Sequence, residues 1–96
     1  MNEIIVANNT EQQQFEVRLE DEVAVLVYRF YKDYIALMHT EVPPELENKG
    51  IASALAKYAL EWAEKHSKKV MVYCPFVASY LKQHPEYNSL VDVKYS

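Results

Sequence analysis

The sequence predicts an α+β domain in which an antiparallel meander is joined to a parallel strand–helix–strand unit, with two main helices. Three observations support this prediction. Up to residue 42, segments of alternating or β-branched residues are separated by short polar turns. After Pro44, apolar residues recur at helical spacing. A short apolar run at 70–73 follows, and a strand, a crossover helix and a second strand in one sheet normally form a right-handed parallel unit.

Two strands are expected before the first turn. Ile4–Val6 is a short apolar run bounded by Asn8 and Asn9, which suits an edge strand. Residues 14–19 alternate between apolar and polar, as a half-buried strand does, and residues 20–22 form a polar turn of hairpin length. The apolar side chains of this second strand are Phe15, Val17 and Leu19.

Two longer strands follow. Residues 23–31 are rich in β-branched and aromatic residues and suit a central strand. Residues 32–33 form a tight turn, and residues 34–42 form a further strand. With strict alternation, one face of that strand carries Ile35, Leu37, His39 and Glu41, and the other carries Ala36, Met38, Thr40 and Val42.

The second half of the chain is mainly helical. The long helix is expected from about residue 49 to 66, with Asn48 as its N-cap. A buried strand at 70–73 leads to a second helix that starts at Pro75, since proline suits the first helical position, and that ends at Pro85. Residues 86–96 are expected to form a short turn and a frayed end.

Size and composition restrict the possible functions. The chain has 96 residues, which suits one minimal domain, and its net charge of −4 argues against a nucleic-acid partner. No apolar stretch approaches the roughly 20 residues of a membrane span, and the N-terminus has no signal-peptide pattern, so we expect a cytoplasmic protein. We expect a monomer or a weak dimer. The single cysteine, Cys74, is expected to be a free thiol.

The segment 40–53 connects the last meander strand to the long helix and suggests an anion site. It holds the only glycine in the sequence, Gly50. A helix start leaves backbone N–H groups without partners, and the helix dipole adds positive potential there. These features predict a phosphate-bearing ligand at residues 47–53. The alternative is a strand-to-helix turn that simply needs a glycine.

Three residues are candidates for chemistry. Cys74 lies at a strand end and before a helix start, where the helix dipole favours a thiolate and where ligand sites of open sheets lie. It could equally be a small core residue. His39 is a candidate general base and Glu41 a weaker one, although a structural strand histidine is the alternative. Cysteine and histidine spacings do not suit a metal site.

Several runs together resemble the short GCN5-related N-acetyltransferase-like proteins, a minimal branch of that superfamily. The resemblance covers roughly residues 14–91. The runs are His39-Thr40-Glu41-Val42-Pro43-Pro44-Glu45-Leu46, Gly50-Ile51-Ala52-Ser53 with Leu55, Cys74-Pro75-Phe76-Val77, Tyr80-Leu81 and His84-Pro85-Glu86-Tyr87.

The resemblance implies an acyl-CoA N-acyltransferase-like fold and an acetyl-CoA ligand. In that superfamily the pantetheine arm pairs with the strand before the turn, here Thr40, Glu41 and Val42. The pyrophosphate lies on a Gln/Arg-x-x-Gly-x-Gly/Ala turn. The residues implied at that turn are Asn48, Lys49, Gly50, Ile51, Ala52 and Ser53. Glu47 departs from the pattern, because it places a carboxylate near the pyrophosphate unless it turns outward, and Lys49 is expected to offset this charge.

The resemblance also implies that Cys74 lies near the acetyl group and takes part in transfer to an amine that the sequence does not identify. Two mechanisms are open. Either Cys74 accepts the acetyl group, or the amine attacks directly, with His39 or water as base and Cys74 or a tyrosine as acid. Two other functions are open: a non-catalytic CoA-binding module, suggested by Glu47, and an interaction protein that uses its exposed sheet edge.

Overall fold

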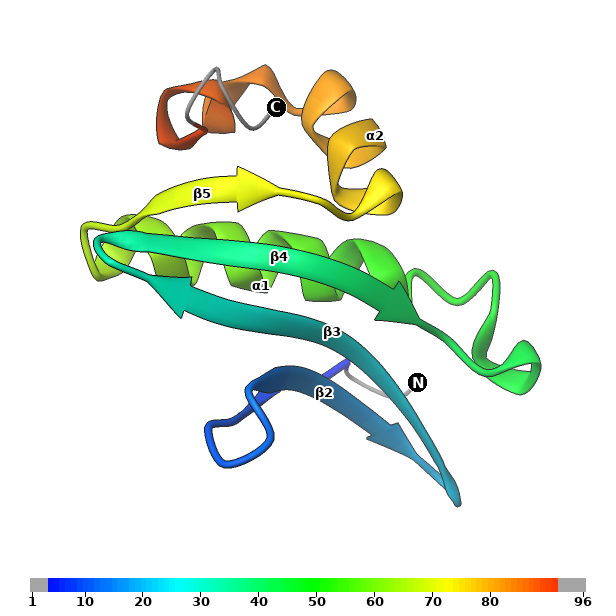
Figure 1. The fold of residues 1–96 in the computed structure, drawn as a ribbon. Helices are drawn as coiled ribbons and strands as arrows, with labels where there is room; N and C mark the ends of the chain where they lie inside the picture. The colour runs from blue at the N-terminus through cyan, green and yellow to red at the C-terminus, as the bar shows by residue number, and fades with distance from the viewer. Residues whose placement is uncertain (1–3, 92–96) are drawn as a thin grey trace.

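The computed structural model describes residues 4–91. Its strands form one mixed five-stranded sheet in the order β1-β2-β3-β4-β5. The first four strands are antiparallel neighbours, and β4 and β5 are parallel, as the sequence predicts. Figure 1 shows α1 lying across one face of the sheet and α2 following β5. The bounds are β1 (Ala7–Asn9), β2 (Gln14–Leu19), β3 (Glu22–Tyr31), β4 (Tyr34–Glu41), η1 (Pro44–Leu46), α1 (Ile51–Lys65), β5 (Lys69–Val72), α2 (Pro75–Gln83) and η2 (Pro85–Leu90).

The core lies between α1 and the facing side of the sheet. Phe15 is fully buried there, with its ring centroid 4.7 Å from that of Tyr28 and 5.3 Å from that of Tyr58 on α1. The helix contributes residues at the predicted spacing, because Ile51, Leu55 and Ala59 are all buried. Among the described helices, none is long and apolar enough to cross a membrane.

The first strand lies later in the chain than predicted. The expected strand at Ile4–Val6 is not formed, and β1 instead contains Asn8 and Asn9, which the sequence suggested as a boundary. Their side chains have specific partners. Asn8 Oδ1 accepts a hydrogen bond from the Tyr28 hydroxyl at 2.7 Å, and Asn9 Nδ2 donates to Glu16 at 2.8 Å. These side-chain bonds offset the low strand propensity of asparagine.

Strict alternation fails in β4 because this strand contains a β-bulge. Tyr28 of β3 pairs with Leu37, but the preceding Val27 pairs with His39, so Met38 is an extra residue. Thr40 pairs with Leu26, which is fully buried on the α1 side. Leu37 and Thr40 therefore share the α1 face, and His39 and Glu41 lie on the opposite face. The predicted grouping of His39 with Leu37 is wrong.

The start of α1 also differs from the prediction. The helix begins at Ile51 rather than 49, and its N-cap is Gly50 rather than Asn48. Asn48 and Gly50 both have left-handed backbone conformations, with φ of 64° and 77°. Two left-handed residues so close together wind the loop tightly, so helical geometry begins only after the second of them.

The C-terminal elements follow the predicted order. Pro75 is at the start of α2, His84 is its C-cap, and Pro85 starts η2. The Tyr87 hydroxyl donates to Glu61 of α1 at 3.2 Å, which ties η2 to the long helix. Burial, with the nearby Glu61 carboxylate, raises the pKa of Tyr87 to about 12, so this donor keeps its proton. The predicted frayed end at 92–96 lies outside the described residues.

We expect the stability of the fold to depend on pH through Glu16, a buried carboxylate on the face opposite α1. The hydrogen bond from Gln14 at 2.6 Å is the main cause that lowers the pKa of Glu16, against the opposing effect of burial. A lowered folded pKa stabilises the fold above the unfolded pKa, and this contribution is lost as pH falls through the folded value. The free energy of unfolding, measured with urea, should therefore fall less between about pH 6 and about pH 3 for Glu16→Gln than for wild type. An equal loss would contradict this role, and exposed Glu11→Gln is the control.

Candidate functional site

The site begins where β4 and β5 separate. Their parallel pairing runs from Tyr34 with Lys69 to Leu37 with Val72, and the Tyr73 N–H donates to the Leu37 carbonyl at 3.0 Å. The described pairing stops there, although β4 continues to Glu41. The chain after β5 turns into α2, as Figure 1 shows, and α2 begins at Pro75. Within residues 4–91, this divergence leaves the last part of β4 without a strand neighbour on that side, so its backbone is open to a ligand.

The second part of the site is the start of α1. The first hydrogen bond of this helix joins the Ala54 N–H to the Gly50 carbonyl at 3.0 Å, and no side chain caps the helix. Among the described residues, the N–H groups of Ile51, Ala52 and Ser53 therefore have no backbone or side-chain acceptor. A Cβ at Gly50 would meet no atom within 4 Å, so the loop is open beside this residue. This arrangement fits the predicted anion site.

Two adjoining grooves connect these parts. One has a volume of about 670 Å³ and is lined by Val23, Val25, Thr40, Glu41, Val42, Pro43, Glu47, Ala52 and Phe76. The other has a volume of about 340 Å³ and is lined by Val42, Leu46, Glu47, Asn48, Gly50, Ile51, Ala52, Ser53 and Phe76. They share Val42, Glu47, Ala52 and Phe76, so they form one continuous path, which we call the β4–α1 groove. This path brings together all the predicted ligand residues except Lys49, which is exposed and lines neither groove.

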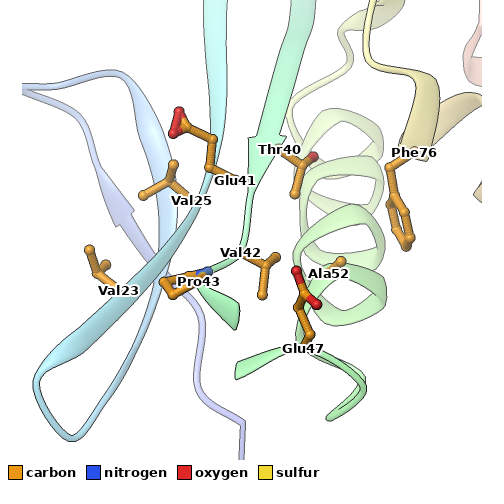
Figure 2. A pocket seen from close by; sticks show the side chains of 9 residues that line it. All are labelled: Val23, Val25, Thr40, Glu41, Val42, Pro43, Glu47, Ala52 and Phe76. Atoms are coloured by element: carbon orange, nitrogen blue, oxygen red, sulfur yellow. The ribbon is translucent and has the colours of Figure 1, made fainter. Parts of the chain in front are cut away.

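Cys74 is buried beside the groove and contacts Thr40. Cys74 lies just before α2, as predicted, and is its N-cap, but it is only 2% exposed and is not a lining residue. Its Sγ lies 3.1 Å from Thr40 Oγ1, within hydrogen-bond distance, and either atom can donate. Figure 2 shows the Thr40 side chain extending from β4 on the side where Phe76 lies. Among the described residues, the threonine hydroxyl is therefore the groove-lining group that lies within hydrogen-bond distance of the thiol.

The structure does not bring His39 and Cys74 together. His39 lies next to Thr40 in β4, so its side chain is on the other face of the sheet. Its Nε2 is 3.4 Å from Glu41 Oε1, and both side chains are more than half exposed. Figure 2 shows the Glu41 side chain directed away from the side of Thr40. A direct proton exchange between His39 and the thiol has no path in this geometry.

Two features of the groove concern residues to which the sequence assigned no ligand contact. Phe76, in the first turn of α2, lines both parts of the groove and is 37% exposed. Its position two residues after Cys74, at a helix start, is the signal that could have identified it. Glu47 also lines both parts, and Figure 2 shows its carboxylate pointing into the groove rather than outward. This orientation opposes an anionic ligand.

Comparisons with known proteins agree in sequence and in fold. The family model for GCN5-related N-acetyl-transferases matches residues 14–90. Protein NATD1 of Mus musculus is 36% identical over 85 residues, which covers 85% of this chain and 77% of that protein. Protein NATD1 of Danio rerio is 32% identical over 87 residues, with coverage of 85% and 79%. The solution structure of a GCN5-like protein from Staphylococcus aureus has the same fold, with a TM-score of 0.73 at 23% identity, covering 96% of this chain and 91% of that chain.

Proposed function

Because the chain belongs to the GCN5-related N-acetyltransferase family, we propose that it binds acetyl-CoA in the β4–α1 groove and transfers the acetyl group to an amine. One observation carries the proposal. The uncapped N–H groups at the start of α1 open into a groove that continues along β4 to Thr40 and the adjacent thiol. A diphosphate on those N–H groups would leave the rest of the ligand in the groove toward Cys74.

The residues present fit acetyl-CoA in three respects. The N–H groups of Ile51, Ala52 and Ser53 supply donors for the diphosphate, and Gly50 leaves the approach open. The unpaired edge of β4 supplies backbone groups for an amide-bearing arm. Phe76 and Val42 supply apolar walls. Acetyl-CoA itself brings the activated thioester, and the protein orients it.

A second function has its own support. The Glu47 carboxylate lies in the groove, and Cys74 is closed off from it. Both features suit a protein that binds CoA weakly and does not transfer the acetyl group. A CoA-binding module without activity is therefore the alternative.

Calorimetric titration with acetyl-CoA tests the shared part of both functions, and absence of binding at about 1 mM would end both. The enzymatic part is tested by acetyl transfer to polylysine, which is monitored as the loss of the thioester. Cys74→Ala separates the two functions, since loss of transfer with retained binding supports the enzyme. Binding without any transfer in wild type supports the module.

We expect Glu47→Gln to tighten acetyl-CoA binding by about threefold to tenfold, because it removes one repulsive charge that solvent partly screens. The gain should shrink as salt is raised. Glu45→Gln is the matched control, because Glu45 is exposed in the same loop and lines neither part of the groove. Unchanged or weaker binding by Glu47→Gln would show that this carboxylate does not face the ligand.

A further inference from the structure

The contact between Thr40 and Cys74 joins the buried thiol to a residue that lines the groove. Cys74 is 2% exposed, whereas Thr40 lines the groove. A reagent or substrate in the groove can therefore reach the threonine side chain, whereas the thiol is buried behind the groove lining. Cys74 in this position cannot attack a thioester unless the threonine moves aside.

The backbone fixes both partners of this contact. The bulge at Met38 turns Thr40 toward the α1 face, where it pairs with the buried Leu26. On the other side, the Tyr73 N–H bonds to Leu37, and the Cys74 carbonyl accepts the Ala78 N–H at 3.1 Å. The distance of 3.1 Å between Oγ1 and Sγ is thus set by β4, by the end of β5 and by the first turn of α2.

We propose that Thr40 is a catalytic residue that donates its hydroxyl proton to the departing sulfur of acetyl-CoA. Cys74 then replaces the proton that Thr40 has lost. This inference rests on the proposed acetyl transfer. A threonine hydroxyl donates one hydrogen bond and accepts others, so it can pass a proton from one sulfur to another. Both ends of this exchange are sulfur atoms, and the hydroxyl between them contacts the Cys74 sulfur at 3.1 Å.

The step balances as follows. The amine nitrogen forms a bond to the acetyl carbon, the carbon–sulfur bond breaks, and its electron pair stays on the departing sulfur. Thr40 gives its hydroxyl proton to that sulfur and takes the proton of the Cys74 thiol. The ammonium formed on the acceptor loses a proton to solvent, and Cys74 regains one from solvent through Thr40 in the same way. No acetyl group is bound to Cys74 at any point.

The first test compares activities toward polylysine. Thr40→Val keeps the shape but removes the hydroxyl, and we expect kcat to fall about 100-fold with KM for acetyl-CoA changed less than about threefold. Thr40→Ser should recover at least about a tenth of the activity. Adding Cys74→Ala to Thr40→Val should cause no further loss, because the two groups act in series. Thr10→Val, an exposed turn residue, is the control.

The second test needs no activity. Alkylation of Cys74 by iodoacetamide, followed by intact mass, should be slow in wild type and in Thr40→Val, which keeps the side-chain shape. It should be at least about tenfold faster in Thr40→Ala, which opens the thiol to the groove. Fast alkylation of the wild type, or an acetyl adduct on Cys74 after mixing with acetyl-CoA, would overturn the inference.

The outcomes separate this inference from the proposed function. A wild-type protein that binds acetyl-CoA without transferring acetyl overturns the enzymatic proposal and the proton relay together. An active wild type whose kcat is unchanged in Thr40→Val overturns the relay alone. Further loss on adding Cys74→Ala would show that the thiol acts without the threonine.

Discussion

Ala52→Glu is expected to weaken acetyl-CoA binding by about 100-fold. Ala52 lies in the first turn of α1 and lines both parts of the β4–α1 groove. A carboxylate there would face the expected diphosphate, and one like-charge pair at about 5 Å costs about 3 kcal/mol at an effective dielectric constant of about 20. The fold should keep its stability, because a negative charge in the first turn of a helix is favourable. Calorimetry measures the binding, and urea unfolding measures the stability.

The matched variant for this result is Ala54→Glu. Ala54 lies two residues later in the same helix, outside both parts of the groove, and its N–H is already bonded to Gly50. Its binding should change by less than about fivefold, since a charge outside the groove lies farther from the diphosphate and solvent screens the interaction more. If both variants bind acetyl-CoA as wild type does, the start of α1 is not the diphosphate site.

Phe15→Ala is expected to lower the free energy of unfolding by about 3–5 kcal/mol. Phe15 is fully buried, and its ring contacts Tyr28, Tyr58 and Trp62, so its loss opens a cavity between the sheet and α1. The whole free energy of unfolding of a small domain is only about 5–15 kcal/mol. The midpoint of thermal unfolding should fall by about 12 °C or more.

The control for this prediction is Tyr31→Ala at the β3–β4 turn. Tyr31 is 53% exposed, and its described side-chain contact is with Lys32, so we expect a loss below about 1 kcal/mol. Calorimetric scanning of both variants gives the comparison. Equal losses would mean that the aromatic cluster around Phe15 does not dominate the core.

The sequence was sufficient to predict the strands and helices that depend on local residue patterns. The meander from β2 to β4 followed from alternation and short turns, and α2 followed from the prolines at 75 and 85. The position of β1 was not accessible in this way. Asn8 is held in a strand by Tyr28, which is 20 residues away in the sequence, and no local pattern contains that bond.

The candidate site was predictable in part for the same reason. The glycine and the start of helical spacing pointed to the loop before α1, although the two left-handed residues moved the helix start to Ile51. The bulge at Met38 depends on the register with β3, so strict alternation placed His39 and Thr40 on the wrong faces. The contact between Thr40 and Cys74 joins residues 34 positions apart.

The extra residue in β4 also limits how this protein could change over generations. Point substitutions can replace the side chain opposite the thiol, but they cannot move His39 to that place, because the parity of the strand decides which neighbour faces inward. Only a one-residue insertion or deletion upstream of His39 could exchange the two. Strand length, rather than side-chain chemistry, therefore separates a hydroxyl-containing site from an imidazole-containing one.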